Sequence, residues 1–253
     1  MELNILVVTD SHEGYEELKI IVEKTEPDII LHAGDFSRGY DDLPSVKRQL
    51  EILEHLRKPI YWVPGNHDHN SFILHMNPLR KFSGDYCEYL SSGKSVLLGD
   101  IAHEIAPGLF IAGLGGAPPS FVGDKERYYG KPYQTKTICD WAVRQVLRPQ
   151  LNMPGQYIIL THFGPLGSDT TKSFKDGVES GNQGLTDLLY EFRDKILINF
   201  HGHQHRGKGI FIWNGIPVVN PGPSVFGNYC EINIRSIDNR WEIVGIKLLP
   251  NKS

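Results

Sequence analysis

Short apolar runs alternate with amphipathic segments in the first quarter of the chain. Residues 3–8 form a continuous apolar run of strand length, and Leu18, Ile21 and Val22 then recur at helical spacing within residues 15–24. The alternation continues through a buried strand, an amphipathic helix and a third strand, which we expect at residues 28–31, 43–56 and 60–63. This order is typical of a mostly parallel sheet that is covered by helices.

The middle of the chain has a different pattern. Three short apolar runs are separated by the turn dipeptides Gly99-Asp100 and Pro107-Gly108, which predicts an antiparallel meander of strands at residues 95–98, 102–105 and 109–114. Residues 115–135 are rich in Gly, Pro and aromatic residues and lack periodicity. A loop of that length is usually functional or mobile, so we regard it as a candidate active-site lid.

The alternation of strands and helices returns in the second half. We expect helices at residues 137–147 and 185–192, and strands at 157–160, 196–200, 210–213, 217–219, 231–234 and 241–248. No linker or internal repeat interrupts the chain. The pattern therefore predicts an α/β fold with four layers, α/β/β/α, in which two mixed sheets pack face to face with helices outside, as a single domain over residues 1–253.

Charge and cysteine content narrow the function classes. The 26 basic and 30 acidic side chains give a net charge of -4, which disfavours a protein that binds long nucleic acids. Three widely spaced cysteines, Cys87, Cys139 and Cys230, fit reduced thiols better than a disulfide framework. Because the sequence shows neither a leader-like segment nor an apolar stretch of roughly 20 residues, we expect a cytoplasmic protein without a membrane segment.

Polar side chains suited to metal binding follow directly after the predicted strands. They are Asp10, His12, Asp35, Asn66, His162, His203 and His205. Loops at the carboxyl ends of strands converge on one crevice, so these seven side chains are expected to meet. Two carboxylates, one amide and four imidazoles exceed what one tetrahedral zinc uses, and two adjacent ions suit phosphate ester hydrolysis. Nitrogen and oxygen ligands without thiolate admit Mn, Fe, Zn, Co or Ni.

Each of these short motifs is by itself typical of an ordinary turn or helix cap. Their ordered combination is the informative feature. The sequence resembles the calcineurin-like metallophosphoesterase superfamily, whose fold is a four-layer sandwich, in five blocks: Asp10-Ser11-His12, Gly34-Asp35, Gly65-Asn66-His67-Asp68, Thr161-His162 and Gly202-His203-Gln204-His205.

The resemblance implies a role for each residue. Asp35 would bridge two divalent metal ions, with manganese as the first candidate. One ion would be held by Asp10, His12 and His205, and the other by Asn66, His162 and His203. His67 would contact the phosphate and protonate the leaving group, while Asp68 would orient the His67 ring. The implied mechanism is in-line attack on phosphorus by a hydroxide that bridges the two ions.

Differences from other branches of the superfamily narrow the resemblance to the smaller phosphodiesterases. Arg38 stands where purple acid phosphatases have a Tyr, and the stretch Phe36-Ser37-Arg38-Gly39 is one residue short of the Ser/Thr phosphatase pattern. Arg38 is a candidate contact for substrate phosphate, or else a solvent-facing loop residue. Residues 32–37 and 161–167 and the turn Asn220-Pro221-Gly222 resemble the smaller phosphodiesterases, including the metallophosphoesterase-domain and cyclic-nucleotide phosphodiesterase-like groups.

We therefore expect an enzyme that hydrolyses a small phosphodiester, such as a nucleotide or cyclic nucleotide. Three alternatives stay open: a phosphomonoesterase or nucleotidase, a nuclease, and a non-catalytic scaffold that keeps the fold. Lys125, Arg127, Tyr128 and Tyr129 either bind phosphate and stack a base or belong to a solvated loop. His32 and His201 flank the motifs and are expected to be packed, hydrogen-bonded side chains. The oligomeric state is left open.

Overall fold

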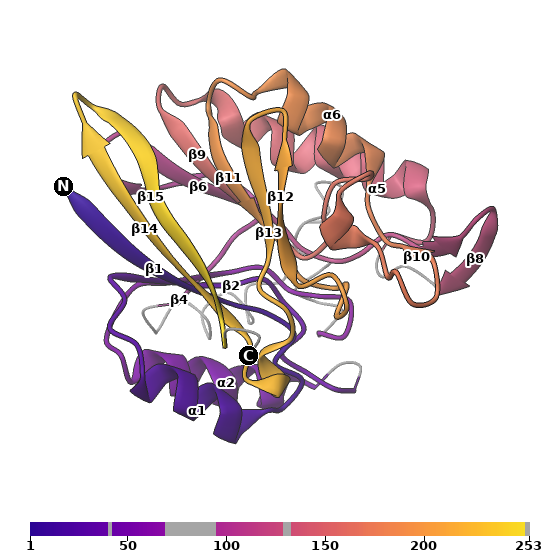
Figure 1. Ribbon diagram of the computed structural model, residues 1–253, viewed down its shortest axis with the longest axis horizontal. Coiled ribbons are helices and arrows are strands. Elements are labelled where there is room, and N and C mark those ends of the chain that lie inside the picture. The colour runs from indigo at the N-terminus through magenta and orange to yellow at the C-terminus, as the bar shows by residue number, and fades with distance from the viewer. Residues whose placement is uncertain (40–41, 69–94, 129–132, 251–253) are drawn as a thin grey trace.

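Two six-stranded sheets form the centre of the molecule in the computed structural model, which describes residues 1–39, 42–68, 95–128 and 133–250 (Figure 1). The first sheet has the order β15-β14-β1-β2-β3-β4. Strands β1 to β4 run parallel, β14 is antiparallel to β1, and β15 is antiparallel to β14. Its strands are β1 (Glu2–Val8), β2 (Ile29–His32), β3 (Ile60–Trp62), β4 (Ser95–Leu97), β14 (Tyr229–Ile237) and β15 (Arg240–Leu249).

The second sheet has the order β12-β13-β11-β9-β6-β5. Strands β13, β11, β9 and β6 run parallel, and the antiparallel strands β12 and β5 form the two edges. Its strands are β5 (His103–Ala106), β6 (Leu109–Leu114), β9 (Gln156–Thr161), β11 (Ile196–Phe200), β12 (Gly209–Trp213) and β13 (Ile216–Asn220). Both sheets thus contain four adjacent parallel strands and are mixed overall.

Helices lie on the outer faces of this pair of sheets. Figure 1 shows α1 (Tyr15–Glu23) and α2 (Leu43–Glu54) beside the first sheet, and α5 (Lys136–Ala142) and α6 (Gln183–Glu191) on the opposite side of the molecule, beside the second. Asp42 caps α2 by accepting from the Ser45 N–H at 3.2 Å, and Asn182 caps α6 by accepting from the Leu185 N–H at 2.8 Å. The single-turn helices are η1 (Val143–Leu147), η2 (Arg148–Asn152), η3 (Asp169–Thr171) and η4 (Ser224–Phe226).

The side-chain alternation of β1 explains the layers. Ile5 and Val7 point into the core that contains residues of both sheets, whereas Leu6 and Val8 point into a second core built with residues of α1 and α2. Because neighbouring residues of a strand face opposite sides, an all-apolar strand is buried between two layers. The predicted α/β architecture of two mixed sheets with helices outside is confirmed.

The predicted meander in the middle of the chain is wrong for its first strand, while the antiparallel pairing of the other two strands is confirmed. Strand β4 pairs with β3 in the first sheet, with Ser95 opposite Ile60, whereas β5 pairs with β6 in the second sheet. The turn at Gly99-Asp100 therefore carries the chain from one sheet to the other. A turn dipeptide indicates that the chain changes direction, but it does not identify the strand with which the next segment pairs.

The segment expected to be a loop contains a hairpin. Strands β7 (Ser120–Val122) and β8 (Lys125–Tyr128) pair antiparallel, and β10 (Val178–Glu179) joins β7 to complete a small third sheet. Figure 1 shows β8 and β10 projecting at one side of the molecule. Strands of two to four residues are too short to show a period of two in the sequence. The lid function of this segment stays a prediction, and Tyr129 lies outside the described residues.

Two further expectations concern cysteines and membranes. Cys139 and Cys230 are free and buried, while Cys87 lies outside the described residues. None of the helices in the described part of the chain has both the length and the apolar character needed to cross a membrane.

Candidate metal centre

The predicted ligands lie where the carboxyl ends of the two sheets meet. Asp10 and His12 follow β1, Asp35 follows β2, Asn66 follows β3, His162 follows β9, and His203 and His205 follow β11. Hydrogen bonds connect these loops across the two sheets. The His203 N–H donates to the Asp10 carboxylate at 3.1 and 3.2 Å, and His162 Nδ1 contacts the Ala33 carbonyl oxygen at 2.7 Å.

Four of the predicted ligands form one compact group. Single ligand atoms of Asp10, His12, Asp35 and His205 all lie within 4.8 Å of one another. His205 Nε2 is 3.2 Å from Asp10 Oδ1, and His12 Nε2 is 3.8 Å from Asp35 Oδ2. The two carboxylates are almost fully buried, at 1% and 2% exposure, whereas the His205 side chain is 43% exposed. The group therefore lies at the floor of a site that opens to solvent beside His205.

A second group shares Asp35 with the first. His162 Nε2 lies 3.0 Å from Asn66 Oδ1 and 3.4 Å from Asp35 Oδ2. The ring of His203 lies next to that of His162, with 5.2 Å between the ring centroids. The same oxygen of Asp35 thus faces one imidazole of each group.

Backbone carbonyl groups set the tautomers of two of these imidazoles. His12 Nδ1 contacts the Ser37 carbonyl oxygen at 2.8 Å, and His162 Nδ1 contacts the Ala33 carbonyl oxygen at 2.7 Å. Because a carbonyl oxygen only accepts, each Nδ1 carries a hydrogen, and each Nε2 faces the carboxylates and is the nitrogen that a metal ion would bind. Metal-bound histidines are commonly oriented in this way. The converging donor set consists of nitrogen and oxygen lone pairs, so its chemistry fits divalent cations.

The electrostatics of the group favour positive charge between the carboxylates. Burial acts to raise the pKa of Asp10 and Asp35, but His205 and His162 respectively hold the pKa of these carboxyl groups well below its usual range. Burial acts to lower the pKa of His162, but the charge and hydrogen bond of Asp35, together with the charge of Asp10, outweigh burial and raise that pKa to about 9. In contrast, burial and then His162 lower the pKa of His203 to about 3. The buried carboxylates thus stabilise cations beside them.

The backbone is strained at the residues that supply these side chains. Asp10, His12, Asp35 and His203 have φ of 49°, 41°, 58° and 65°, in the left-handed region that few residues other than glycine adopt. Such strain commonly occurs at functional sites. Two glycines lie against these residues: a Cβ at Gly65 would overlap the Asp35 carboxylate, and one at Gly202 would overlap Thr9 and the Asp10 carboxylate.

His67 lies beside the first group. Its ring is edge-on to that of His12, with 5.2 Å between the ring centroids. The backbone N–H of His67 donates to Asp35 Oδ1 at 2.8 Å. His67 Nδ1 contacts the Arg38 carbonyl oxygen at 3.0 Å, and Arg38 itself is exposed. The Arg38 N–H donates to Glu13 Oε1 at 3.3 Å. The loop after β2 therefore places Arg38 at the solvent-facing rim next to His67.

The contacts of Asp68 differ from the orienting role that the resemblance implied. Its carboxylate accepts four backbone N–H groups, those of Asp35, Phe36, Ser37 and Gly65, at 2.8 to 3.1 Å. A carboxylate offers about four lone-pair sites, so these donors occupy it fully. His67 Nδ1 instead contacts the Arg38 carbonyl oxygen.

Several supporting side chains were not singled out as site residues from the sequence. Thr9 Oγ1 donates to Asp10 Oδ2 at 2.7 Å, and no sequence pattern distinguishes that threonine. The expectation that His32 and His201 are packed, hydrogen-bonded side chains is confirmed. His32 accepts from the Gly34 N–H at 3.1 Å and contacts Ser11 Oγ at 2.9 Å, and His201 contacts Thr170 Oγ1 at 2.7 Å. Burial lowers the pKa of His32 and His201 to about 3 and about 4, so both stay neutral.

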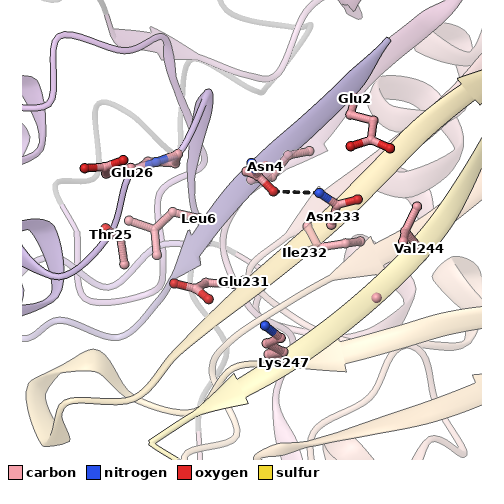
Figure 2. Close-up of a pocket in the computed structure, with 13 residues that line it drawn as sticks. Glu2, Asn4, Leu6, Thr25, Glu26, Glu231, Ile232, Asn233, Val244 and Lys247 are labelled. Carbon is pink, nitrogen blue, oxygen red and sulfur yellow. Dashed lines mark hydrogen bonds between the residues drawn. The ribbon is translucent and has the colours of Figure 1, made fainter.

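A groove on another part of the surface is separate from this centre. It has a volume of about 580 Å³ and is lined by residues of β1, β14, β15 and the turn after α1 (Figure 2). Asn4 and Asn233 are hydrogen-bonded at 2.7 Å within it, and Glu231 and Lys247 lie at one end (Figure 2). None of the predicted metal-site residues lines this groove.

Comparison with known proteins agrees with this geometry. A family model described as calcineurin-like phosphoesterase matches residues 3–207, which is most of the chain. The chain therefore belongs to the calcineurin-like phosphoesterase family, a class of phosphoric ester hydrolases, and its four-residue cluster is a candidate site for divalent metal ions. No curated protein sequence matches the chain.

Solved structures share the fold at low sequence identity. TT1561 of Thermus thermophilus has a TM-score of 0.62 and 16% identity, covering 96% of this chain and 98% of its own. A phosphopantetheinyl hydrolase of Mycobacterium tuberculosis has a TM-score of 0.58 and 16% identity, covering 98% and 96%. A dimetal phosphatase of Danio rerio has a TM-score of 0.58 and 11% identity, covering 98% of both chains. At these identities the similarity shows the fold.

Proposed function

We propose that this chain is a phosphodiesterase that uses two divalent cations, with Mn²⁺ as the first candidate, to hydrolyse a small phosphodiester such as a nucleotide or cyclic nucleotide. The observation that carries the proposal is the position of Asp35. Its Oδ2 atom lies 3.8 Å from His12 Nε2 and 3.4 Å from His162 Nε2, between the two groups of ligand atoms. Paired metal sites of this kind are suited to phosphate ester hydrolysis.

Each group of side chains would hold one cation. Asp10, His12 and His205 would bind the first, and Asn66, His162 and His203 the second, with Asp35 shared between them. When bound, the two cations supply Lewis acidity that activates water and offsets the negative charge of the phosphate. Burial of Asp10 and Asp35 strengthens their interaction with cations, because little solvent screens it.

His67 is the proposed general acid. Its Nδ1 faces the Arg38 carbonyl oxygen at 3.0 Å, so Nδ1 carries a hydrogen and Nε2 is the atom that transfers a proton to the leaving-group oxygen. Arg38 is exposed beside His67, and its guanidinium group is suited to binding a phosphate oxygen pair in a bidentate manner. His67 would thus act on the leaving group while Arg38 contributes to substrate binding.

The preference for diesters is supported by residues 32–37 and 161–167, which resemble the smaller phosphodiesterases. The net charge of -4 supports a small substrate over a long nucleic acid.

The free, buried thiols of Cys139 and Cys230 suit the reducing cytoplasm, which is the compartment that we propose.

Turnover of two chromogenic esters tests the proposal. Bis-p-nitrophenyl phosphate and p-nitrophenyl phosphate are compared in wild type with each of Mn²⁺, Co²⁺, Ni²⁺, Zn²⁺ and Fe²⁺. We expect a higher kcat/KM for the diester, and we expect His67→Ala to lower kcat by about 10²–10⁴-fold. A higher kcat/KM for the monoester would reject the diester preference. Wild-type turnover no greater than that of His67→Ala with every metal would support a scaffold instead.

A further inference from the structure

The carboxylate of Asp68 fills a pocket of backbone N–H groups below the metal centre. Asp68 Oδ1 accepts from Phe36 and Ser37 at 2.9 and 3.1 Å, and Oδ2 accepts from Asp35 and Gly65 at 2.9 and 2.8 Å. The side chain is buried, with 2% of the residue exposed. Successive N–H groups beside a left-handed residue form an anion-binding nest, and Asp35 has φ of 58°. Asp68 is thus the anion of a nest whose first residue is Asp35.

The residues of this nest supply or adjoin ligands of both proposed cations. The segment 35–37 supplies the bridging carboxylate of Asp35 and also the Ser37 carbonyl oxygen that orients His12 at 2.8 Å. Gly65 directly precedes Asn66, and the N–H of His67 donates to Asp35 Oδ1 at 2.8 Å. The Asp68 carboxylate therefore joins the loop after β2 to the loop after β3 at the point where each supplies a ligand.

We propose that Asp68 is a positioning residue for the metal centre, acting through the backbone of residues 35–37 and 65 and not through the His67 ring. The inference rests on the proposed function insofar as it takes Asp35 and His12 to be metal ligands. Polar groups that orient metal ligands typically contribute 10- to 100-fold to metal affinity or activity. Asp68→Asn keeps the size of the side chain but removes the charge and places an N–H₂ group against backbone donors.

A double-mutant cycle distinguishes an effect of Asp68 through the backbone from an effect through the His67 ring. Metal-free wild type, Asp68→Asn, His67→Ala and the double variant are titrated calorimetrically with Mn²⁺ alone. We expect Asp68→Asn to weaken Mn²⁺ binding by about ten-fold or more in both the wild-type and the His67→Ala backgrounds. His67→Ala alone should leave Mn²⁺ affinity unchanged, because its backbone N–H remains. Wild-type Mn²⁺ affinity in Asp68→Asn, together with no added loss of kcat in the His67→Ala background, would overturn the proposal.

Two features keep the test independent of other outcomes. Calorimetry with metal alone needs no substrate, so a wild type that binds Mn²⁺ without hydrolysing esters would reject the proposed function and leave the comparison of affinities valid. Amide hydrogen exchange is measured on metal-free wild type, so its result does not depend on whether a variant folds. We expect slow exchange at Asp35, Phe36, Ser37 and Gly65, and exchange at the rate of unprotected loop amides would overturn the inference.

Discussion

The Nε2 atoms of His12 and His205 lie 3.1 Å apart although 193 positions separate the two residues in the chain. Since the Ser37 carbonyl group fixes the hydrogen of His12 on Nδ1, the Nε2 lone pair of His12 points toward the other ring. Asp10 Oδ1 lies 3.2 Å from His205 Nε2. A carboxylate and two imidazoles this close together are suited to binding one cation, as the proposed function requires.

Removal of the shared carboxylate should affect both cations at once. We expect Asp35→Ala to lose both metal ions and essentially all turnover, because its Oδ2 faces His12 and His162. Elemental analysis and bis-p-nitrophenyl phosphate hydrolysis measure the two effects. Asp194→Ala removes a carboxylate that is 91% exposed and is the matched control, with wild-type metal content expected. An active Asp35→Ala protein that retains its full complement of metal would contradict the bridging assignment.

Arg38 should act on substrate binding and not on the metals. We expect Arg38→Ala to raise KM on the order of ten-fold with kcat largely retained, since a hydrogen bond to a charged group contributes about 1.5–3 kcal/mol. Steady-state kinetics with the diester measure this division, and Arg240→Ala, which removes another exposed arginine, is the control. An unchanged KM in Arg38→Ala would show that this side chain faces solvent and does not bind the substrate.

The close approach of Gly65 to Asp35 gives a test that removes no ligand. The methyl group of Gly65→Ala would overlap the carboxylate and backbone nitrogen of Asp35, so the bridging group must move. Displacement of a catalytic group by about 1 Å can cost 10²-fold, and we expect kcat to fall by at least about that factor. Gly245→Ala is the control, because its Cβ would meet open space. Comparable kcat in the two variants would mean that the loop after β3 can shift without moving Asp35.

The buried thiols should resist alkylation in the folded protein. Burial raises the pKa of Cys230 to about 12 and that of Cys139 well above its usual range. A raised pKa lowers the thiolate fraction at pH 8, for Cys230 by on the order of 10³-fold relative to an ordinary thiol. Peptide-resolved mass spectrometry after an iodoacetamide pulse measures each site, and the same pulse in urea provides the control. Equal labelling of native and unfolded protein would show that these thiols are accessible.

Local sequence patterns predicted most of the fold. The strands at β6 and β11 were predicted with the bounds that they have, and α1 ends within one residue of its predicted end. The errors occur where pairing is not local. Strand β4 was expected to pair with the strand that follows it in the chain, but it pairs with β3. Strands β7, β8 and β10 are too short to show a period of two in the sequence.

The site was predictable to a similar extent. The expected convergence of the seven polar side chains follows from their positions at the carboxyl ends of strands, and the structure brings them together. Their assignment to individual cations stays a proposal. The environment of Asp68 was not predictable, because the nest depends on the left-handed backbone of Asp35, and nothing in the sequence indicates that conformation.

Electron paramagnetic resonance of the Mn²⁺-loaded wild type, combined with elemental analysis, shows whether two ions share the Asp35 carboxylate. We expect two Mn²⁺ ions per chain with the multiline spectrum of an exchange-coupled pair, since Asp35 lies between the two groups of ligands. Saturation at one ion per chain, or two ions with uncoupled six-line spectra, would contradict a dinuclear centre bridged by Asp35.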